Sequence, residues 1–144
     1  FQVLEEQLEA TPLIQVNLQS QEWGTYVGAL VSGEYPIGYL GWFFDYPDPS
    51  NYLEPFAQSQ ASASLGVNYA SEEMDELFRQ GGASTDQDER ASIYEDAQNL
   101  YATDVVTIPL HFEEEFVVFN NDTVSDVVVG AALNVLYELI DMNN

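Results

Sequence analysis

A run of apolar and aromatic residues from Tyr35 to Phe44 leads directly into a proline-rich loop, and this arrangement strongly constrains the fold. The run is short for a core helix, and glycine and proline interrupt it, so we predict a buried strand. The loop that follows, residues 45–51, contains two prolines that fix φ and has the Asp, Ser and Asn residues that favour turns. The sequence therefore places two carboxylates, Asp45 and Asp48, just beyond an aromatic strand.

Hydrophobic periodicity and capping residues predict helices and strands that alternate along the rest of the chain. Helices are expected over residues 1–10, 21–31, 72–80 and 87–102, and strands over residues 14–18, 35–44, 105–110, 116–119 and 127–129. The small polar residues 58–66 predict a surface loop, Gly81-Gly82 is expected to end a helix, and the tail from Leu133 to Met142 fits either a strand or a helix. This alternation is typical of the α/β class.

The charge balance excludes several classes of partner. Arg79 and Arg90 are the only basic residues, against 25 acidic ones, which gives the 144-residue chain a net charge of −23. Nucleic-acid binding and attraction to an anionic membrane both need clustered Lys and Arg. Disorder is excluded as well, because 46% of the residues are hydrophobic and 13% are aromatic. No apolar run is long enough to insert into a membrane.

The chain offers little for metal, thiol or nucleotide chemistry. It has no cysteine, and His111 is its single histidine, so disulfides and multi-histidine metal sites are excluded. His111 precedes Phe112 and a run of three glutamates, and we expect a packed histidine at a strand end, followed by a solvated turn. Phosphate-binding glycine loops and serine-nucleophile motifs are missing from the sequence. We therefore expect a binding protein without a cofactor or a resident metal.

Asp45 is the strongest candidate for a binding residue. A carboxylate at the end of a strand, walled by aromatic rings such as Trp42, can hold an ammonium group by charge-assisted hydrogen bonds and cation–π attraction. Three other roles stay open on residue chemistry alone. Asp45 and Asp48 can simply cap the loop and a following helix, act as the carboxylate pair of a glycosidase, or bind Ca²⁺ together with Asn51.

The order of several short motifs resembles a known family. The motifs are Val16 to Tyr26 (VNLQSQEWGTY), Gly33-Glu34-Tyr35, Gly41 to Pro49 (GWFFDYPDP), Asn68 to Ser71 (NYAS), Thr85 to Arg90 (TDQDER) and Ile108-Pro109-Leu110. In this order they are similar to the C-terminal part of family 5 extracellular solute-binding proteins, the dipeptide, oligopeptide and nickel receptors of ABC importers. The resemblance extends over about residues 1–119, and the GWFFDYPDP segment and the helix opening with Arg90 are its most specific parts.

The resemblance implies the C-terminal α/β lobe of a two-lobed periplasmic-binding-protein-like fold that closes on its ligand. Residues 1–125 would form this lobe, and residues 126–144 would return toward the other lobe. Asp45 would pair with the α-ammonium of a short peptide, the strand Gly41 to Phe43 would pair with the peptide backbone, and Trp42 would line a side-chain pocket. Phe44 and Tyr46 adjoin this site, and the bulky Phe43-Phe44 pair is a departure that would narrow it or favour a stacked ligand such as a sugar.

Further expectations follow from the same resemblance. The partners would be a small-molecule or short-peptide ligand and the permease subunits of an ABC transporter, and the protein would be extracellular or periplasmic, with a lipid anchor as one option. Because the chain begins at Phe1 inside an amphipathic pattern, we expect it to be a fragment of a longer protein. A carboxylate-based glycoside hydrolase and an acidic protein-interaction module are the alternatives.

The absence of lysine predicts a dependence on salt. Crowded surface carboxylates with almost no basic partners repel one another at low ionic strength, and added salt screens this repulsion. We therefore expect a protein from a saline setting, whose melting temperature in calorimetry rises from low salt to molar NaCl. A flat or falling curve would contradict this explanation of the charge.

Overall fold

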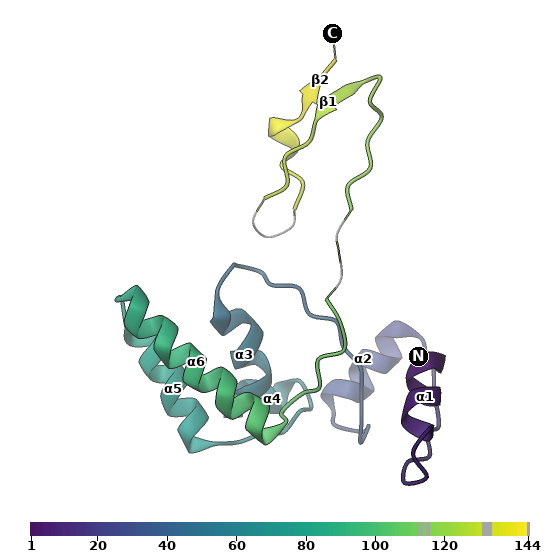
Figure 1. Cartoon of the computed structure of the whole chain (residues 1–144), viewed down its shortest axis with the longest axis vertical. Helices are drawn as coiled ribbons and strands as arrows, with labels where there is room; N and C mark the ends of the chain where they lie inside the picture. The colour runs from purple at the N-terminus through teal and green to yellow at the C-terminus, as the bar shows by residue number, and fades with distance from the viewer. Residues whose placement is uncertain (113, 115, 131–133, 144) are drawn as a thin grey trace.

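The computed structural model describes residues 1–112, 114, 116–130 and 134–143, and it is rich in helix (Figure 1). The elements are α1 (Gln2–Glu9), α2 (Trp23–Val31), α3 (Pro49–Ala57), α4 (Ser59–Ser64), α5 (Glu72–Ala83), α6 (Gln87–Asp104), strand β1 (Val124–Asp126), a short 3₁₀ helix (Tyr137–Leu139) and strand β2 (Asp141–Met142). None of the described helices combines the length and the apolar character needed to cross a membrane.

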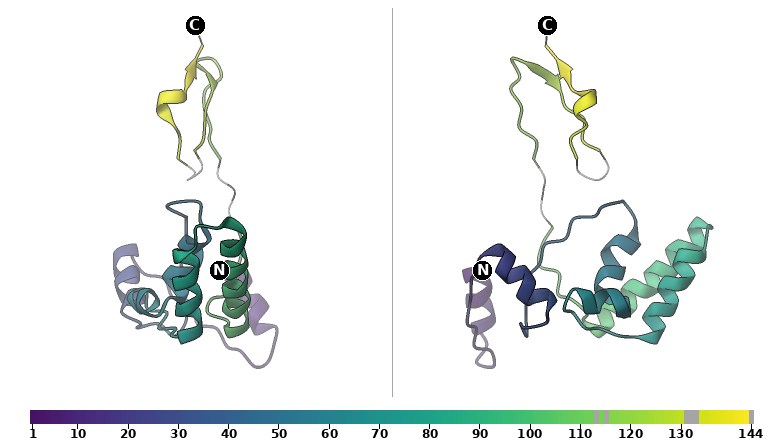
Figure 2. Two further views of the ribbon diagram at one scale, coloured as in Figure 1. Left: turned by 90° about the vertical axis from the view of Figure 1, so that its left-hand side faces the viewer. Right: turned by 180° about the vertical axis from the view of Figure 1, so that it is seen from behind.

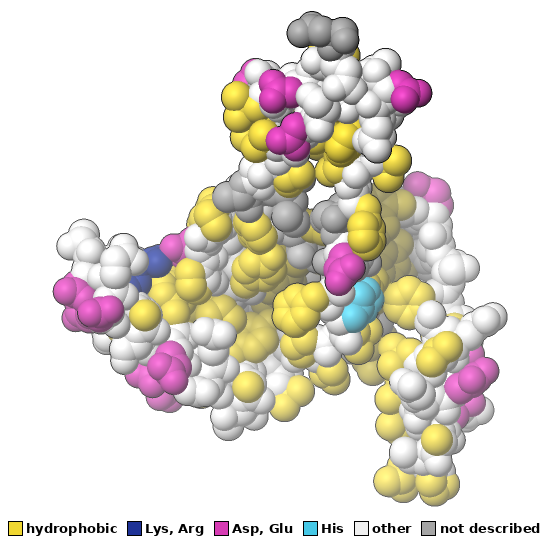
Figure 3. Space-filling view, turned by 45° about the horizontal axis from the view of Figure 1, so that its top comes forward, with side chains coloured by type: hydrophobic (Ala, Val, Ile, Leu, Met, Phe, Trp, Pro, Cys, Tyr) yellow, Lys and Arg dark blue, Asp and Glu magenta, His cyan; other side chains and the backbone are white. Residues whose placement is uncertain are grey.

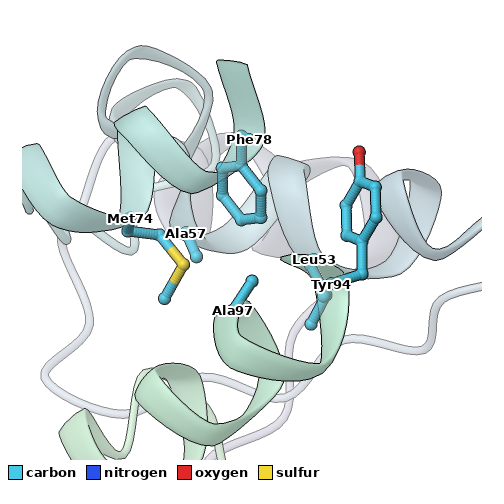
Figure 4. Packing of buried hydrophobic residues seen from close by; sticks show 6 residues of the cluster. All are labelled: Leu53, Ala57, Met74, Phe78, Tyr94 and Ala97. Atoms are coloured by element: carbon cyan, nitrogen blue, oxygen red, sulfur yellow. The ribbon is translucent and has the colours of Figure 1, made fainter. Parts of the chain in front are cut away.

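Helices α3 to α6 pack together and enclose the hydrophobic core. The long helices α5 and α6 lie side by side, and α3 packs against both of them. The buried apolar side chains converge between these helices, as Figure 4 shows, and comprise Leu53, Ala57, Met74, Phe78, Tyr94 and Ala97. Burial of these groups is the main stabilising contribution in this part of the chain.

Side-chain caps fix where the core helices begin. Ser71 accepts a hydrogen bond from the backbone N–H of Met74 at the start of α5, and Asp86 accepts from Asp88 and Glu89 at the start of α6. Helix α6 ends at Val105, which has a φ of 53°, a left-handed conformation that is unfavourable for a β-branched residue. The chain therefore turns sharply as it leaves the core.

The remaining segments lie outside this core. Helix α2 is joined to the chain that follows it by Tyr26, whose hydroxyl accepts from the backbone N–H of Tyr39 at 2.7 Å and donates to the Tyr39 carbonyl at 2.6 Å. Further along the chain, β1 and β2 form an antiparallel pair (Figure 2), in which Val124 is opposite Met142. The β1–β2 pair is set apart from the helices in every view.

The structure confirms the four predicted helices and corrects several other expectations. Residues 58–66 are not a loop but contain α4, and Gly81-Gly82 lies inside α5, where buried Gly81 allows the ring of Tyr94 to approach closely. Helix α3 was not predicted as a helix, although Asp48 and Pro49 are a favourable cap and first residue.

The predicted strands are the largest difference. Residues 14–18, 35–44, 105–110 and 116–119 are neither helix nor strand, and residues 127–129 contribute one isolated bridge, between Val129 and Val135. A strand needs a partner for its backbone groups, and among the described residues only 127–129 has one, through the bridge to Val135 and a hydrogen bond from Leu136 to Val128. Glu113 and Glu115 of the predicted turn, and Leu133 of the tail, lie outside the described residues.

Candidate functional site

The candidate site lies where residues 40–48 meet the start of α3. Asn51, in the first turn of that helix, is buried and contacts the two main candidate binding residues, Trp42 and Asp45. Its side-chain oxygen accepts a hydrogen bond from the backbone N–H of Asp45 at 2.9 Å, and its amide nitrogen lies 3.5 Å from Asp45 Oδ2. Its backbone carbonyl accepts from Trp42 Nε1 at 2.8 Å. Asn51 therefore fixes the positions of Trp42 and Asp45 relative to each other.

Aromatic contacts hold the preceding segment on α3. The rings of Trp42 and Phe56 meet edge to face with their centroids 5.0 Å apart, and Phe44 lies 5.7 Å from Tyr52. Phe43 is 55% exposed, because it alternates with the two anchored rings. Gly41 is also exposed, and its Cα faces open space.

The backbone of this segment is available for pairing. Within the described residues, the N–H and C=O groups of residues 40–44 form no hydrogen bond with another backbone group. Asp45 is exposed at the end of the segment, although one carboxylate oxygen lies near the Asn51 side chain. The segment thus offers unpaired donors and acceptors that lead up to an accessible negative charge.

A shallow cavity of about 350 Å³, open to solvent, adjoins the segment on the α3–α4 side. Trp42 and Tyr46 form its aromatic wall and Glu54 supplies a carboxylate; Ser50, Pro55, Ala61, Ser64 and Leu65 complete the lining. Of the predicted site residues, the structure brings Trp42 and Tyr46 into this cavity. Gly41, Phe43, Phe44 and Asp45 are adjacent in the chain but are not part of its lining.

A second set of polar contacts joins the loop to α6. The Arg90 guanidinium donates to both oxygens of Asp48, at 2.6 Å and 2.9 Å, and lies over the ring of Tyr94. The Tyr94 hydroxyl in turn donates to Glu54 at 2.9 Å. We refer to these four residues, Asp48, Arg90, Tyr94 and Glu54, as the Arg90 network. It links the site loop to a helix 42 positions further along the chain.

The network perturbs the protonation of its members. The hydrogen bonds from Arg90 hold the pKa of the Asp48 carboxyl well below its ordinary value. Burial raises the pKa of Tyr94 to about 12, and the hydrogen bond to Glu54 adds to this effect. Asp48 therefore stays ionised and paired at all ordinary pH values, so it cannot donate a proton as the general acid of a glycosidase.

The geometry also disfavours a cation site formed by Asp45, Asp48 and Asn51. Arg90 donates to both oxygens of Asp48, and the Asn51 side-chain oxygen already accepts from the Asp45 backbone. In the part of the chain that the structure describes, no cluster of three or more His, Cys, Asp or Glu side chains is arranged to hold a metal ion.

The structure also corrects the expectation for the single histidine. His111, expected to be packed at a strand end, has an exposed side chain.

The Asp48–Arg90 pair predicts a pH dependence of stability. Because the Asp48 pKa is lowered on folding, the pair stabilises the protein above the ordinary carboxyl pKa of 3.8, and this contribution disappears as the pH falls through the lower folded value. Asp48→Asn keeps a side chain that can cap α3 but loses the charge. We expect it to lower the free energy of unfolding at pH 7 by about 1–3 kcal/mol, with the difference from wild type shrinking below about pH 4 in urea titrations.

Arg79→Gln is the matched control. It removes the ion pair between Arg79 and Glu76, which is open to solvent on α5, and exposed pairs contribute little to stability. An equal loss in both variants, or a difference for Asp48→Asn that persists unchanged to pH 2, would contradict a specific role for the Asp48–Arg90 pair.

Sequence comparison with known proteins relates the chain to a family. No family model matches the chain, but individual relatives do. The chain is 35% identical over 124 residues to di/tripeptide-binding protein 4 of Pseudomonas aeruginosa, covering 84% of this chain and 23% of the relative. It is 29% identical over 99 residues to the oligopeptide-binding protein OppA of Bacillus subtilis, covering 69% of this chain and 18% of the relative.

Similarity extends to a relative named for a different ligand, heme-binding protein A of Haemophilus influenzae, at 30% identity over 98 residues, 67% of this chain and 18% of the relative. The chain spans about a fifth of the length of the curated relatives that it matches. The similarity to several oligopeptide- and di/tripeptide-binding proteins confirms the resemblance found in the motifs. The chain therefore belongs to the family 5 extracellular solute-binding proteins.

Proposed function

We propose that this chain is part of the ligand-binding lobe of a protein that captures short peptides for an ABC importer. The observation that carries the proposal is the arrangement around Asn51, which holds an exposed Asp45 carboxylate at the end of a segment with unpaired backbone groups. Relatives named for oligopeptide and di/tripeptide binding support a peptide as the ligand. Because one relative is named for heme binding, the class of ligand has to be tested by experiment.

Peptide binding would use three parts of the site: the Asp45 carboxylate, the backbone of residues 41–43 and the cavity beside them. The free amine of the peptide would pair with the Asp45 carboxylate through charge-assisted hydrogen bonds. The peptide backbone would pair with residues 41–43, as an added strand pairs with a free sheet edge. A side chain of the ligand would enter the cavity that Trp42 and Tyr46 line. None of these contacts requires a reaction, so the protein would act as a binder and not as an enzyme.

The wider setting of the site is part of the same proposal. Residues 1–125 would belong to the C-terminal lobe of a two-lobed fold, residues 126–144 would return toward the other lobe, and hinge closure would bury the peptide between them. Delivery would be to the permease subunits of the importer, outside the cytoplasmic membrane, in the periplasm or at the cell surface. The relatives' names support this assignment.

The two alternatives have less support. A glycoside hydrolase would need a second carboxyl group that can carry a proton, whereas Asp48 is paired with Arg90. An interaction module that acts through charge alone would bind cationic partners without regard to the position of Asp45, and salt would abolish that binding.

The Asp45 anchor predicts discrimination between free and blocked peptide amines. In the full-length protein, calorimetry should find that N-acetylation of a short peptide weakens binding by about 10- to 100-fold, since a hydrogen-bonded charge is lost. Asp45→Asn should weaken binding of the free peptide by a similar factor and leave binding of the acetylated peptide nearly unchanged.

Asp88→Asn, which removes an exposed carboxylate from the first turn of α6, is the control for loss of charge. It should leave both affinities unchanged. If Asp45→Asn binds the free peptide as tightly as wild type does, the anchoring role is wrong. If Asp45→Asn and Asp88→Asn weaken binding equally, the effect comes from net charge, as the interaction-module alternative requires.

A further inference from the structure

Glu54 lines two neighbouring cavities of the helical part of the chain. One is the cavity beside Trp42 and Tyr46, and the other, of about 360 Å³, is bounded by residues of α3, α4 and α5. Both are open to solvent, and Asp75 adds a second carboxylate to the latter. Glu54 itself is half-buried on α3. A negative charge therefore lies in the wall of the cavity that adjoins the candidate site.

The Glu54 carboxylate can accept more hydrogen bonds than the one that the structure gives it. The Tyr94 hydroxyl donates to its Oε1 at 2.9 Å, whereas an ionised carboxylate offers about four acceptor positions. The two arginines of the chain are each paired with a different carboxylate, so neither forms an ion pair with Glu54. A cation brought by a ligand would supply the missing positive partner.

The rest of the same cavity suits a long, flexible side chain. Its lining residues with rings or aliphatic groups are Trp42, Tyr46, Pro55 and Leu65. Lysine and arginine pack their apolar stems on such surfaces while the charged head reaches a polar partner, and aromatic faces also attract cations. An acidic ligand side chain would be repelled by Glu54, and a short apolar one would leave the carboxylate without a counter-charge.

We propose that this cavity selects a basic side chain, so that the preferred ligands are short peptides with lysine or arginine at one position. Glu54 is then the specificity-determining residue. The inference rests on the proposed function, because it takes the ligand to be a peptide whose amine is held by Asp45. It adds the chemical class of the side chain that enters beside Trp42.

The charge of the whole chain is a competing source of preference for cations. Figure 3 shows Asp and Glu side chains spread over the face that it presents, and the net charge is −23. Long-range attraction of this kind favours lysine equally at every position of a peptide. A contact inside the cavity favours lysine at one position only, because one side chain of the ligand enters it. Position dependence therefore separates the two.

Calorimetry on the full-length protein tests the proposal with trialanine in which one residue at a time is replaced by lysine or by norleucine, which has the same stem without the ammonium. At one position, lysine should bind about 10-fold more tightly than norleucine. In Glu54→Gln, which keeps an oxygen that can accept from Tyr94, this ratio should fall to about one. Glu95→Gln removes an exposed carboxylate of α6 that lines neither cavity, and it should leave the ratio unchanged.

The ratio compares two peptides on the same variant, so a general loss of folded protein does not alter it. Equal binding of lysine and norleucine peptides at all three positions would overturn the proposal, and so would a ratio that persists in Glu54→Gln. A lysine preference of equal size at all three positions would assign it to net charge and also overturn the proposal. If no peptide binds, trialanine included, the proposed function fails and this inference with it. If peptides bind without a lysine preference, only this inference fails.

Discussion

The bidentate ion pair between Arg90 and Asp48 is the contact on which the geometry of the site depends. One end of it is the N-cap of α3, and the other is a residue of α6 whose guanidinium also lies over Tyr94. The chain has only two basic residues, and the other, Arg79, pairs locally within α5. Arg90 is therefore the cation that fixes the loop to the core, and Asn51, one turn into α3, transmits that position to Asp45.

The helices were predictable from the sequence because their signals are local. Ser71 and Asp86 are strong caps, and periodic apolar residues follow each of them. Helices α3 and α4 were not predicted because their local sequence signals are weak. Helix α3 contains Pro55, which argues against a helix interior, and α4 consists of small polar residues without an apolar stripe. Helix α3 packs against α5 and α6, and α4 packs against α3, and a single sequence does not display these contacts.

The candidate site was predictable in part. The aromatic run that ends in a proline-rich loop singled out Trp42 and Asp45, and the structure brings both to Asn51. Asn51 was interpreted as a turn residue and a possible cation ligand, because nothing in its local sequence indicates that it orients its neighbours. The ladder of hydrogen bonds expected for the strands depends on partners distant in the chain, and the described residues do not contain them. Apolar residues do alternate in the predicted strand segments, but a periodic pattern does not show whether a neighbouring strand is present to pair with them.

In the proposed function, the loop held by Arg90 and Asn51 presents Asp45 to the amine of a bound peptide. A crystal structure of the full-length protein with a short peptide tests it most directly. We expect the peptide α-ammonium nitrogen to lie within about 3 Å of an Asp45 carboxylate oxygen, with Asn51 still hydrogen-bonded to the Asp45 backbone. A peptide bound with its amine elsewhere, or a ligand that has no contact with residues 41–46, would contradict it.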